Sequence, residues 1–184
     1  MEQPGERNPA PGSLRLVQDL VNTVDLEGGA DELRDADALT AWARENGVAG
    51  APFDAGDLAD VLVLREALRD VCQAHTGTDV PPCSAEALDA LLSRAPLRLV
   101  IDPEGAAAVR SAPGLTGAAG LTAHLAAVIT GAVADGTWPR LKSCAADTCR
   151  WVYYDRSPSG RSRWCTMSIC GSRAKMRAYR NRSR

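Results

Sequence analysis

The stretch Cys144-Ala-Ala-Asp-Thr-Cys149 and its counterpart Cys165-Thr-Met-Ser-Ile-Cys170 decide how the end of this chain folds. Each segment places four residues between two cysteines, and 15 residues separate the two segments. Two close pairs let a short chain supply the four soft ligands of a tetrahedral zinc site with two turns. The surrounding residues are mostly polar, so a bound metal would supply much of the folding free energy of this region. We therefore expect one structural Zn²⁺ per chain, bound by Cys144, Cys149, Cys165 and Cys170.

Two other roles for these four cysteines are disfavoured. A pair of disulfides conflicts with the lack of a secretory signal in the polar, Pro/Gly-rich start of the chain, because cytosolic thiols stay reduced. Four unrelated core cysteines conflict with the polarity of the surrounding residues. Cys72 differs, because it falls on the apolar stripe of a predicted helix and is expected to be an inert core residue. Cys83 follows two prolines in a predicted loop.

Charge divides the chain near residue 139. Residues 1–139 contain 9 arginines, no lysine and 21 acidic residues, a net charge of −12. Residues 140–184 contain 12 lysines and arginines against 2 aspartates, a net charge of +10. This asymmetry is hidden in the overall net charge of −2, and it indicates a polyanionic partner such as nucleic acid for the basic end. No apolar run reaches the roughly 20 residues that a membrane span requires, so no membrane association is expected.

The cysteine-rich end resembles the CGNR zinc-finger family. The resemblance is carried by Trp151-Val-Tyr-Tyr-Asp155, by Arg161-Ser-Arg-Trp-Cys165 and by Gly171-Ser-Arg-Ala-Lys175, and it covers nearly all of residues 141–180. The family signature is Cys-Gly-Asn-Arg, whereas this chain has Ser172 in place of the asparagine. Both residue types are short, form hydrogen bonds and suit a helix start, so we expect the fold to survive the exchange.

The first part of the chain is similar to the ABATE domain, which usually precedes this finger. The matching motifs are Leu20-Val-Asn-Thr-Val-Asp25, the pair Gly28-Gly29, and Asp37-Ala-Leu-Thr-Ala-Trp42. The resemblance implies a transcription regulator with an N-terminal sensing or stress-response domain and a C-terminal DNA-binding finger.

Hydrophobic periodicity predicts helices over residues 13–26, 37–46, 57–75, 84–94 and 117–134, with Asp57 as the N-cap of the third. Residues 97–101 and 106–110 are strand-like and flank an Asp-Pro-Glu-Gly turn, which predicts a small β-hairpin. The predicted fold class is therefore mainly α with one hairpin. We expect a disordered leader over 1–12, a helical domain over 13–134, a linker over 135–143 and a four-cysteine zinc-finger module with a basic C-terminal helix over 144–184.

The basic end offers candidate nucleic-acid contacts. If Gly171-Ser172 opens a terminal helix, Arg173, Arg177 and Arg180 fall on one face of it. Arginine forks suit phosphate oxygens and guanine edges, and a helix fits the major groove. Lys175 widens the positive surface, and Arg161 and Arg163 flank the loop between the cysteine pairs. The alternative for this charge run is a solvated tail that keeps the protein in solution.

Aromatic residues cluster in the same segment. They could stack on bases, as in proteins that bind single strands. The favoured alternative is a small core over the metal, formed by Trp151 and Trp164 beside the ligand cysteines, with Tyr154 as the aromatic residue most exposed to solvent.

The N-terminal domain carries polar residues within an apolar helix. Asn22 and Thr23, with Arg65 from the long helix, could line a pocket for a small-molecule or protein effector. The favoured alternative is an internal hydrogen-bond network without a ligand. The sequence holds no phosphate-binding glycine loop, no nucleophile elbow and no zinc-protease motif, and four thiolates would leave zinc no open position. We therefore expect no enzymatic activity.

Taken together, the sequence predicts a DNA-binding transcriptional regulator of the cytoplasm, associated with the nucleoid, whose acidic domain senses a ligand or a partner. The alternative is a zinc-organised module that binds protein or RNA. The acidic domain could also fold back on the basic end and mask it. A homo-oligomer is compatible with the sequence.

Overall fold

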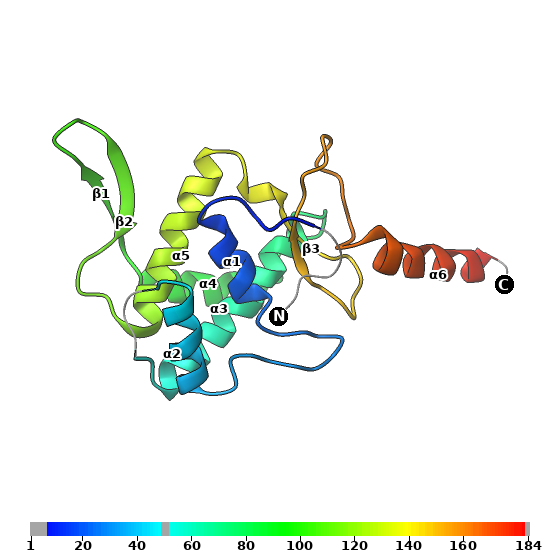
Figure 1. The fold of residues 1–184 in the computed structure, drawn as a ribbon, viewed down its shortest axis with the longest axis horizontal. Coiled ribbons are helices and arrows are strands. Elements are labelled where there is room, and N and C mark those ends of the chain that lie inside the picture. Colours follow the sequence, from blue (N-terminus) through cyan, green and yellow to red (C-terminus); the bar gives the residue numbers. More distant parts are fainter. Residues whose placement is uncertain (1–6, 49–51, 183–184) are drawn as a thin grey trace.

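The structure, a computed structural model, describes residues 7–48 and 52–182. Within these residues the chain forms six α-helices and two antiparallel strand pairs. A helical body holds α1 (Leu14–Val21), α2 (Ala36–Glu45), α3 (Ala55–Ala74), α4 (Pro82–Ser93) and α5 (Gly117–Ala134). A hairpin of β1 (Leu97–Ile101) and β2 (Ala107–Ser111) extends from one side, and α6 (Ser172–Arg182) extends from the other (Figure 1). The fold is thus mainly helical with a small hairpin, as the sequence predicts.

The long helix α3 begins earlier than the sequence analysis predicts. Asp54, rather than Asp57, is the N-cap, and its side chain accepts a hydrogen bond from the Asp57 backbone. Asp57 is the third residue of the helix, and its side chain accepts a hydrogen bond from the Asp54 backbone N–H. The two reciprocal bonds form a capping box. The Asp57 carboxylate also accepts from the backbone N–H of Ala118 at 2.7 Å, so one side chain fixes the starts of both α3 and α5.

The helix α1 is shorter than predicted, and its polar residues explain why. It ends at Val21, followed by Asn22 as the C-cap. Thr23 turns its hydroxyl back to the Leu20 carbonyl at 2.8 Å, and Val24 then pairs with Asp31 in a β-bridge. The residues interpreted as polar positions within a helix are therefore the residues that terminate it.

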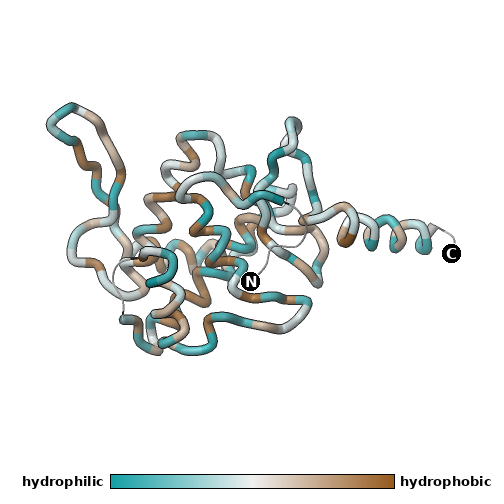
Figure 2. The backbone as a smooth tube through the Cα atoms, viewed as in Figure 1, coloured by the Kyte–Doolittle hydropathy of each residue, from teal (hydrophilic) through white to brown (hydrophobic). Residues whose placement is uncertain are grey.

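The helix α5 is the most apolar element of the body. Its 18 residues are long and apolar enough for a membrane span by composition alone. It packs against α1, α3 and α4, and Leu121, Ala123 and Leu125 are buried in the core that these helices share. The tube coloured by hydropathy shows it as one of the more hydrophobic parts of the body, in contrast to the mostly hydrophilic α6 (Figure 2). These contacts identify α5 as a core helix.

The predicted linker is an ordered part of the fold. Residues 138–140 form the short helix η1 (Trp138–Arg140), and β3 (Leu141–Ser143) follows at once and pairs with β4 (Val152–Tyr154). The apolar side chains Leu141, Val152 and Tyr154 are buried in the same core as α1, α3 and α5. The two parts that charge separates near residue 139 therefore share one hydrophobic core. A π-helical turn, η2 (Met167–Gly171), leads into α6.

The predicted disordered leader is only partly described, and its described part is packed. Residues 1–6 lie outside the described residues, but Ala10 is buried and its backbone N–H donates to the Gln18 side chain at 2.7 Å. Arg7 reaches the far end of the chain, where its guanidinium donates to the Cys165 carbonyl at 2.6 Å and to the Trp164 carbonyl at 3.1 Å. The prediction of disorder is therefore wrong for residues 7–12.

Candidate metal centre and basic surface

Four cysteine sulfurs meet at one point in the C-terminal part. The Sγ atoms of Cys144, Cys149, Cys165 and Cys170 all lie within 4.8 Å of one another. The Cys149–Cys165 and Cys165–Cys170 sulfur pairs are 3.7 and 3.6 Å apart. A tetrahedron with Zn–S bonds of about 2.3 Å has edges of about 3.8 Å, whereas a disulfide is about 2.05 Å long. The donor set and its spacing therefore fit one structural zinc ion with all four positions filled by protein.

Backbone hydrogen bonds form the first cysteine pair into a knuckle. The Ala146 carbonyl accepts from the N–H groups of Cys149 and Arg150 at 2.9 and 3.0 Å, which closes a tight turn. Arg150 then takes a left-handed conformation with φ of 46°, unusual for a residue with a Cβ. This reversal returns the chain to β4, where the Trp151 carbonyl accepts from the Cys144 N–H at 2.9 Å.

Cys170 of the second cysteine pair lies on the π-helical turn before α6, and Cys165 precedes this turn. The turn is tightly packed at Gly171, where a Cβ would lie 2.8 Å from the Met167 sulfur and 3.3 Å from the Trp164 ring. Ser172, which replaces the family asparagine, donates its hydroxyl to the Met167 carbonyl at 3.0 Å. The serine thus ties the π-turn to the first residue of α6, in keeping with the expectation that the exchange preserves the fold.

Hydrogen bonds among the four thiols favour ionisation of one of them and oppose ionisation of others. Hydrogen bonds from the Cys149 and Cys165 thiols lower the pKa of Cys144 to about 2, while the bond to Cys144 raises the pKa of Cys149 to about 12. Hydrogen bonds to Cys144 and Cys149 also raise the pKa of Cys165. A divalent cation supplies the counter-charge that lets all four become thiolates, which is why such a site couples folding to metal binding. Cys72, by contrast, is fully buried, and burial raises the pKa of its thiol to about 12.

A small core surrounds the cysteines. It contains Trp151 and Tyr153 with the ligand cysteines, and Trp164 packs on it while partly exposed. This agrees with the predicted core over the metal. Tyr154 is not the exposed aromatic residue that the sequence suggested, since it is 6% exposed and belongs to the larger core. The exposed aromatic residue in this segment is Tyr179 on α6, at 66%.

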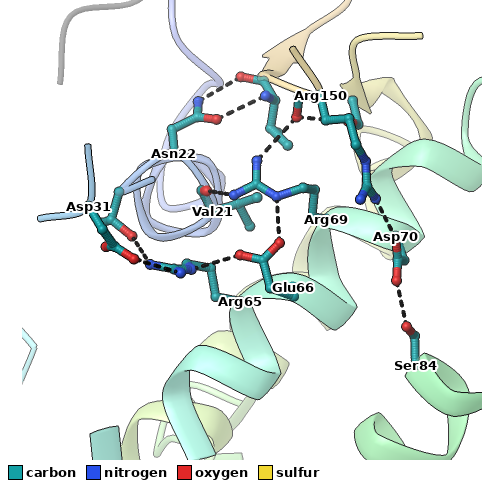
Figure 3. A network of polar contacts seen from close by, with 12 residues as sticks. Val21, Asn22, Asp31, Arg65, Glu66, Arg69, Asp70, Ser84 and Arg150 are labelled. Atoms are coloured by element: carbon teal, nitrogen blue, oxygen red, sulfur yellow. Dashed lines mark hydrogen bonds and ion pairs between the residues drawn. The ribbon is translucent and has the colours of Figure 1, made fainter. Parts of the chain in front are cut away.

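A polar network joins the zinc-binding part to the helical body (Figure 3). Asn22 donates to the Val152 carbonyl at 2.8 Å and accepts from the Val152 N–H at 2.9 Å. Arg69, which is fully buried, donates to the Arg150 carbonyl at 3.1 Å and to the Val21 carbonyl at 2.5 Å. The guanidinium of Arg150 pairs with Asp70 of α3. Arg150 and Val152, which lie within three positions after the first cysteine pair, are therefore held by the helical body.

The three residues predicted to line an effector pocket have internal partners instead. Asn22 is engaged with Val152, while Thr23 accepts from Arg65 at 3.2 Å. Arg65 also makes a two-pronged ion pair with Asp31 at 2.8 and 2.9 Å. Desolvation is the largest single effect and raises the pKa of Asp31, but the hydrogen bonds from Arg65 and the Leu33 N–H and the nearby arginine charges together outweigh it and lower the pKa of this carboxyl. The geometry matches the alternative of an internal network.

Sequence reasoning missed Arg7, Arg69 and Arg150 as the residues that position the metal centre. The signal was present for Arg69, because an arginine on the buried face of a predicted helix requires acceptors. For Arg7 and Arg150 the partners are backbone carbonyls and a distant carboxylate, which no local pattern reveals.

Two of the predicted nucleic-acid residues lie on a loop that a buried ion pair shapes. Lys142 and Asp155 are buried and joined at 3.1 Å. Asp155 also accepts from the backbone N–H groups of Ser157 and Ser162. Burial alone would raise the pKa of Asp155, but the bonds from these serines and from the Lys142 ammonium lower it below its usual value. The loop that this pair anchors presents Arg161 and Arg163, both exposed.

The other predicted residues lie on α6. Arg173, Arg177 and Arg180 line one groove on this helix together with Ile169 and Met176, so the predicted common face exists. Lys175 is exposed on the same helix. Arg173 also forms an ion pair with Glu27 of the helical body, in which both side chains are about half exposed.

Comparison with known families divides the chain at the same place as its charge. The profile of the ABATE family, described as "Putative stress-induced transcription regulator", matches residues 14–136, which is about two thirds of the chain. The profile of the CGNR zinc finger matches residues 140–183 and includes all four cysteines of the metal centre. No curated protein matches the sequence.

Proposed function

The chain belongs to the ABATE family and ends in a CGNR zinc finger, and from this we propose that it is a DNA-binding transcriptional regulator. In this role the metal centre is structural, the basic surface of α6 and the loop before it contact DNA, and the helical body senses an effector. The protein has no catalytic role in this proposal, and it acts in the cytoplasm at the nucleoid.

The observation that carries the proposal is the position of α6. The helix leaves the metal centre and projects away from the body (Figure 1). Its first turn follows the metal ligand Cys170 directly, while its arginines are exposed along one side. A projecting helix with a row of guanidinium groups can enter a major groove, where arginine binds guanine edges and phosphates.

The loop arginines support the same role. Arg161 and Arg163 emerge close to Cys165, so they share an anchor with α6. Because the buried Lys142–Asp155 pair fixes the loop, these two side chains begin from an ordered backbone. In the proposed complex they bind phosphates beside the groove that α6 occupies, which would fix the register of the helix on the duplex.

The effector part of the proposal rests on the contacts between the two segments. Changes in the helical body can reach the metal centre through Asn22–Val152 and Arg69–Arg150, since both acceptor residues lie within three positions after Cys149. Binding energy in the body could thus alter how α6 and its loop are presented.

The test is duplex binding by the full zinc-loaded chain across a range of salt concentrations. Phosphate contacts release counterions, so log affinity should fall linearly with log salt, at about −0.9 per contact. A sequence-randomised duplex pool then reveals any preferred site. Binding that shows no salt dependence, or no duplex binding at low salt, would rule out this function.

A second candidate has its own supporting observation. The groove along the arginine face of α6 is also lined by Ile169 of the π-helical turn and by Met176, which are 43% and 59% exposed. Apolar side chains among arginines suit an acidic amphipathic partner, so the same surface could bind protein. RNA is the third outcome, recognised by competition between duplex DNA and folded RNA. Capture of an acidic helical peptide with no nucleic-acid binding would favour the protein-binding role.

A further inference from the structure

A pocket of about 520 Å³ lies where the helical body meets the zinc finger. Five separate segments form its walls: the N-terminal arm, α1, the loop between α1 and α2, the end of α2 and the residue before β4. Its charged and aromatic side chains are Arg7, Arg15, Asp19, Glu32, Glu45, Trp42 and Trp151. The pocket is distinct from the Asn22–Thr23–Arg65 network, of which only Asn22 reaches its wall.

Two arginines and three carboxylates, Asp19, Glu32 and Glu45, line this pocket, which leaves a negative surplus. Arg15 is paired with Asp19 at 3.1 Å. Arg7 is also committed, because it donates to the Trp164 and Cys165 carbonyls and lies 4.5 Å over the Tyr153 ring. Glu45 has no ion-pair partner among the described residues, and it stands in the last turn of α2, where the helix dipole is negative. The pocket therefore favours a positive charge at its α2 side.

The aromatic walls suit the same kind of ligand. Trp42 and Trp151 both line the pocket, and they are only 7% and 6% exposed, so their indole rings are held in place by the cores beneath them. Indole rings attract ammonium and guanidinium groups through their electron-rich faces.

From these observations we infer that the pocket is the effector site, and that its ligand is a small organic cation. The ammonium or guanidinium group lies between Glu45 and the indoles. This inference rests on the proposed sensing role, and it assigns that role to a different place from the one expected from the sequence.

The position of the pocket explains how occupancy would reach the finger. Trp151 directly follows Arg150, whose carbonyl is held by Arg69, and directly precedes Val152, which is held by Asn22. A ligand that fixes Trp151 against α2 stiffens this short segment between the first cysteine pair and β4. The presentation of the metal centre then depends on the ligand.

The test uses the full zinc-loaded chain and four probes at constant ionic strength: choline, ethanolamine in its cationic form, agmatine and the neutral choline analogue 3,3-dimethylbutan-1-ol. Binding is followed by tryptophan fluorescence and by calorimetry. At least one cation should bind saturably, with the neutral analogue much weaker. No saturation by any cation at millimolar concentration, or equal binding of the neutral analogue, would overturn the inference.

A matched pair of variants locates the site. Glu45→Gln removes the exposed carboxylate at the pocket and should raise the dissociation constant of the bound cation at least about threefold. Glu86→Gln removes an exposed carboxylate on α4 and should leave that constant unchanged. Equal effects of the two changes would place the cation elsewhere. Because none of these measurements uses DNA, loss of cation binding with duplex binding intact would reject this inference alone. Cation binding without duplex binding would reject the DNA-binding role alone.

Discussion

Asn22 and Val152, 130 positions apart in the chain, hold each other by two reciprocal hydrogen bonds of 2.8 and 2.9 Å. The side-chain amide of Asn22 thus makes with Val152 of β4 the two hydrogen bonds that a residue of a neighbouring strand would make. Asn22 follows α1, and Val152 lies just after the first cysteine pair. These two hydrogen bonds, from a side chain to the backbone, therefore align the helical body with the finger. This contact is tied to no particular residue type at position 152.

We expect Asn22→Ala to destabilise the whole chain by about 2–3 kcal/mol, because it leaves the buried N–H of Val152 without an acceptor. Gln18 still reaches the Val152 carbonyl at 3.2 Å, which limits the loss. Urea denaturation of the zinc-loaded protein measures the change. Asn8→Ala, at an exposed asparagine, should change stability by less than about 0.5 kcal/mol. A similar loss from both variants would contradict the importance of the pair.

Removal of zinc should weaken the helical body as well as the finger. Leu141, Val152 and Tyr154 belong to the body's core but are carried by the strands that flank the first cysteine pair. Their release would cost about 1.5–3 kcal/mol each in lost burial. Hydrogen exchange should therefore show lower protection in α1 and α3 after chelation, with recovery when zinc is returned. Unchanged protection of these helices would show that the two parts fold independently. Elemental analysis should give about one zinc per chain.

Acid should destabilise the protein through His75. Its Nδ1 lies 2.7 Å from the Leu141 carbonyl, and burial lowers the pKa of this ring. A lowered folded-state pKa means that the stabilisation is complete above the unfolded value of about 6.5 and is lost as pH falls below it. His75→Gln should flatten the decline in stability just below pH 6.5. His124→Gln, at the exposed histidine, should keep the decline, and protonation of the zinc ligands affects both variants equally. The same slope in both variants would contradict the prediction.

Changing Arg177 to Ala should weaken duplex binding if α6 contacts DNA as proposed. If the side chain binds a phosphate, the slope of log affinity against log salt should become shallower by about one unit. If it contacts a base edge, the slope should change less, and discrimination against the wrong base should drop by about 1–3 kcal/mol. Arg110→Ala on the β-hairpin is the control. Equal binding by the wild type and by an Arg173/Arg177/Arg180 triple alanine variant with zinc bound would show that this face does not contact DNA and serves only to keep the protein in solution.

Glu27→Gln should strengthen duplex binding at low salt. Glu27 holds Arg173 in an ion pair, so part of the basic face is masked by the acidic body. Both side chains are about half exposed, and such pairs are worth at most about 1 kcal/mol, so the gain should stay below about fivefold and vanish at high salt. Glu104→Gln, in the turn between β1 and β2, removes the same charge without freeing an arginine and serves as the control. A gain that persists at high salt would exclude release of an ion pair as its cause.

Local patterns predicted most of the secondary structure. The hairpin and α5 are close to their expected positions because their apolar runs are bounded by Pro and Gly, which end elements for local reasons. The spacing of the cysteines predicted the metal centre, because a zinc site imposes its geometry on residues near in sequence. The start of α3 was missed because both Asp54 and Asp57 are good caps, and only the capping box distinguishes them.

The relation between the two parts could not be read from local patterns. Composition and charge separate them, yet Leu141 and Val152 lie in the body's core. Charge reports on solvent-facing atoms, while a shared core is formed by side chains that face inward, so a change in charge along the chain does not mark a break in packing. The fate of Asn22 was undecided for a similar reason, because its partner is a main-chain group that every sequence carries.

The bond from Arg7 to the carbonyls of Trp164 and Cys165 spans 157 and 158 positions. During synthesis the arm that carries Arg7 leaves the ribosome long before its acceptors exist, and so do α1 and the first half of the core. The core of the helical body therefore stays incomplete, with apolar surface exposed, until β3 and β4 have been synthesised and the cysteines beside them have bound a metal ion. Contacts between residues far apart in the sequence slow folding. Because completion of this core depends on the metal centre, the folding rate of newly made chains should increase with the supply of zinc in the cell.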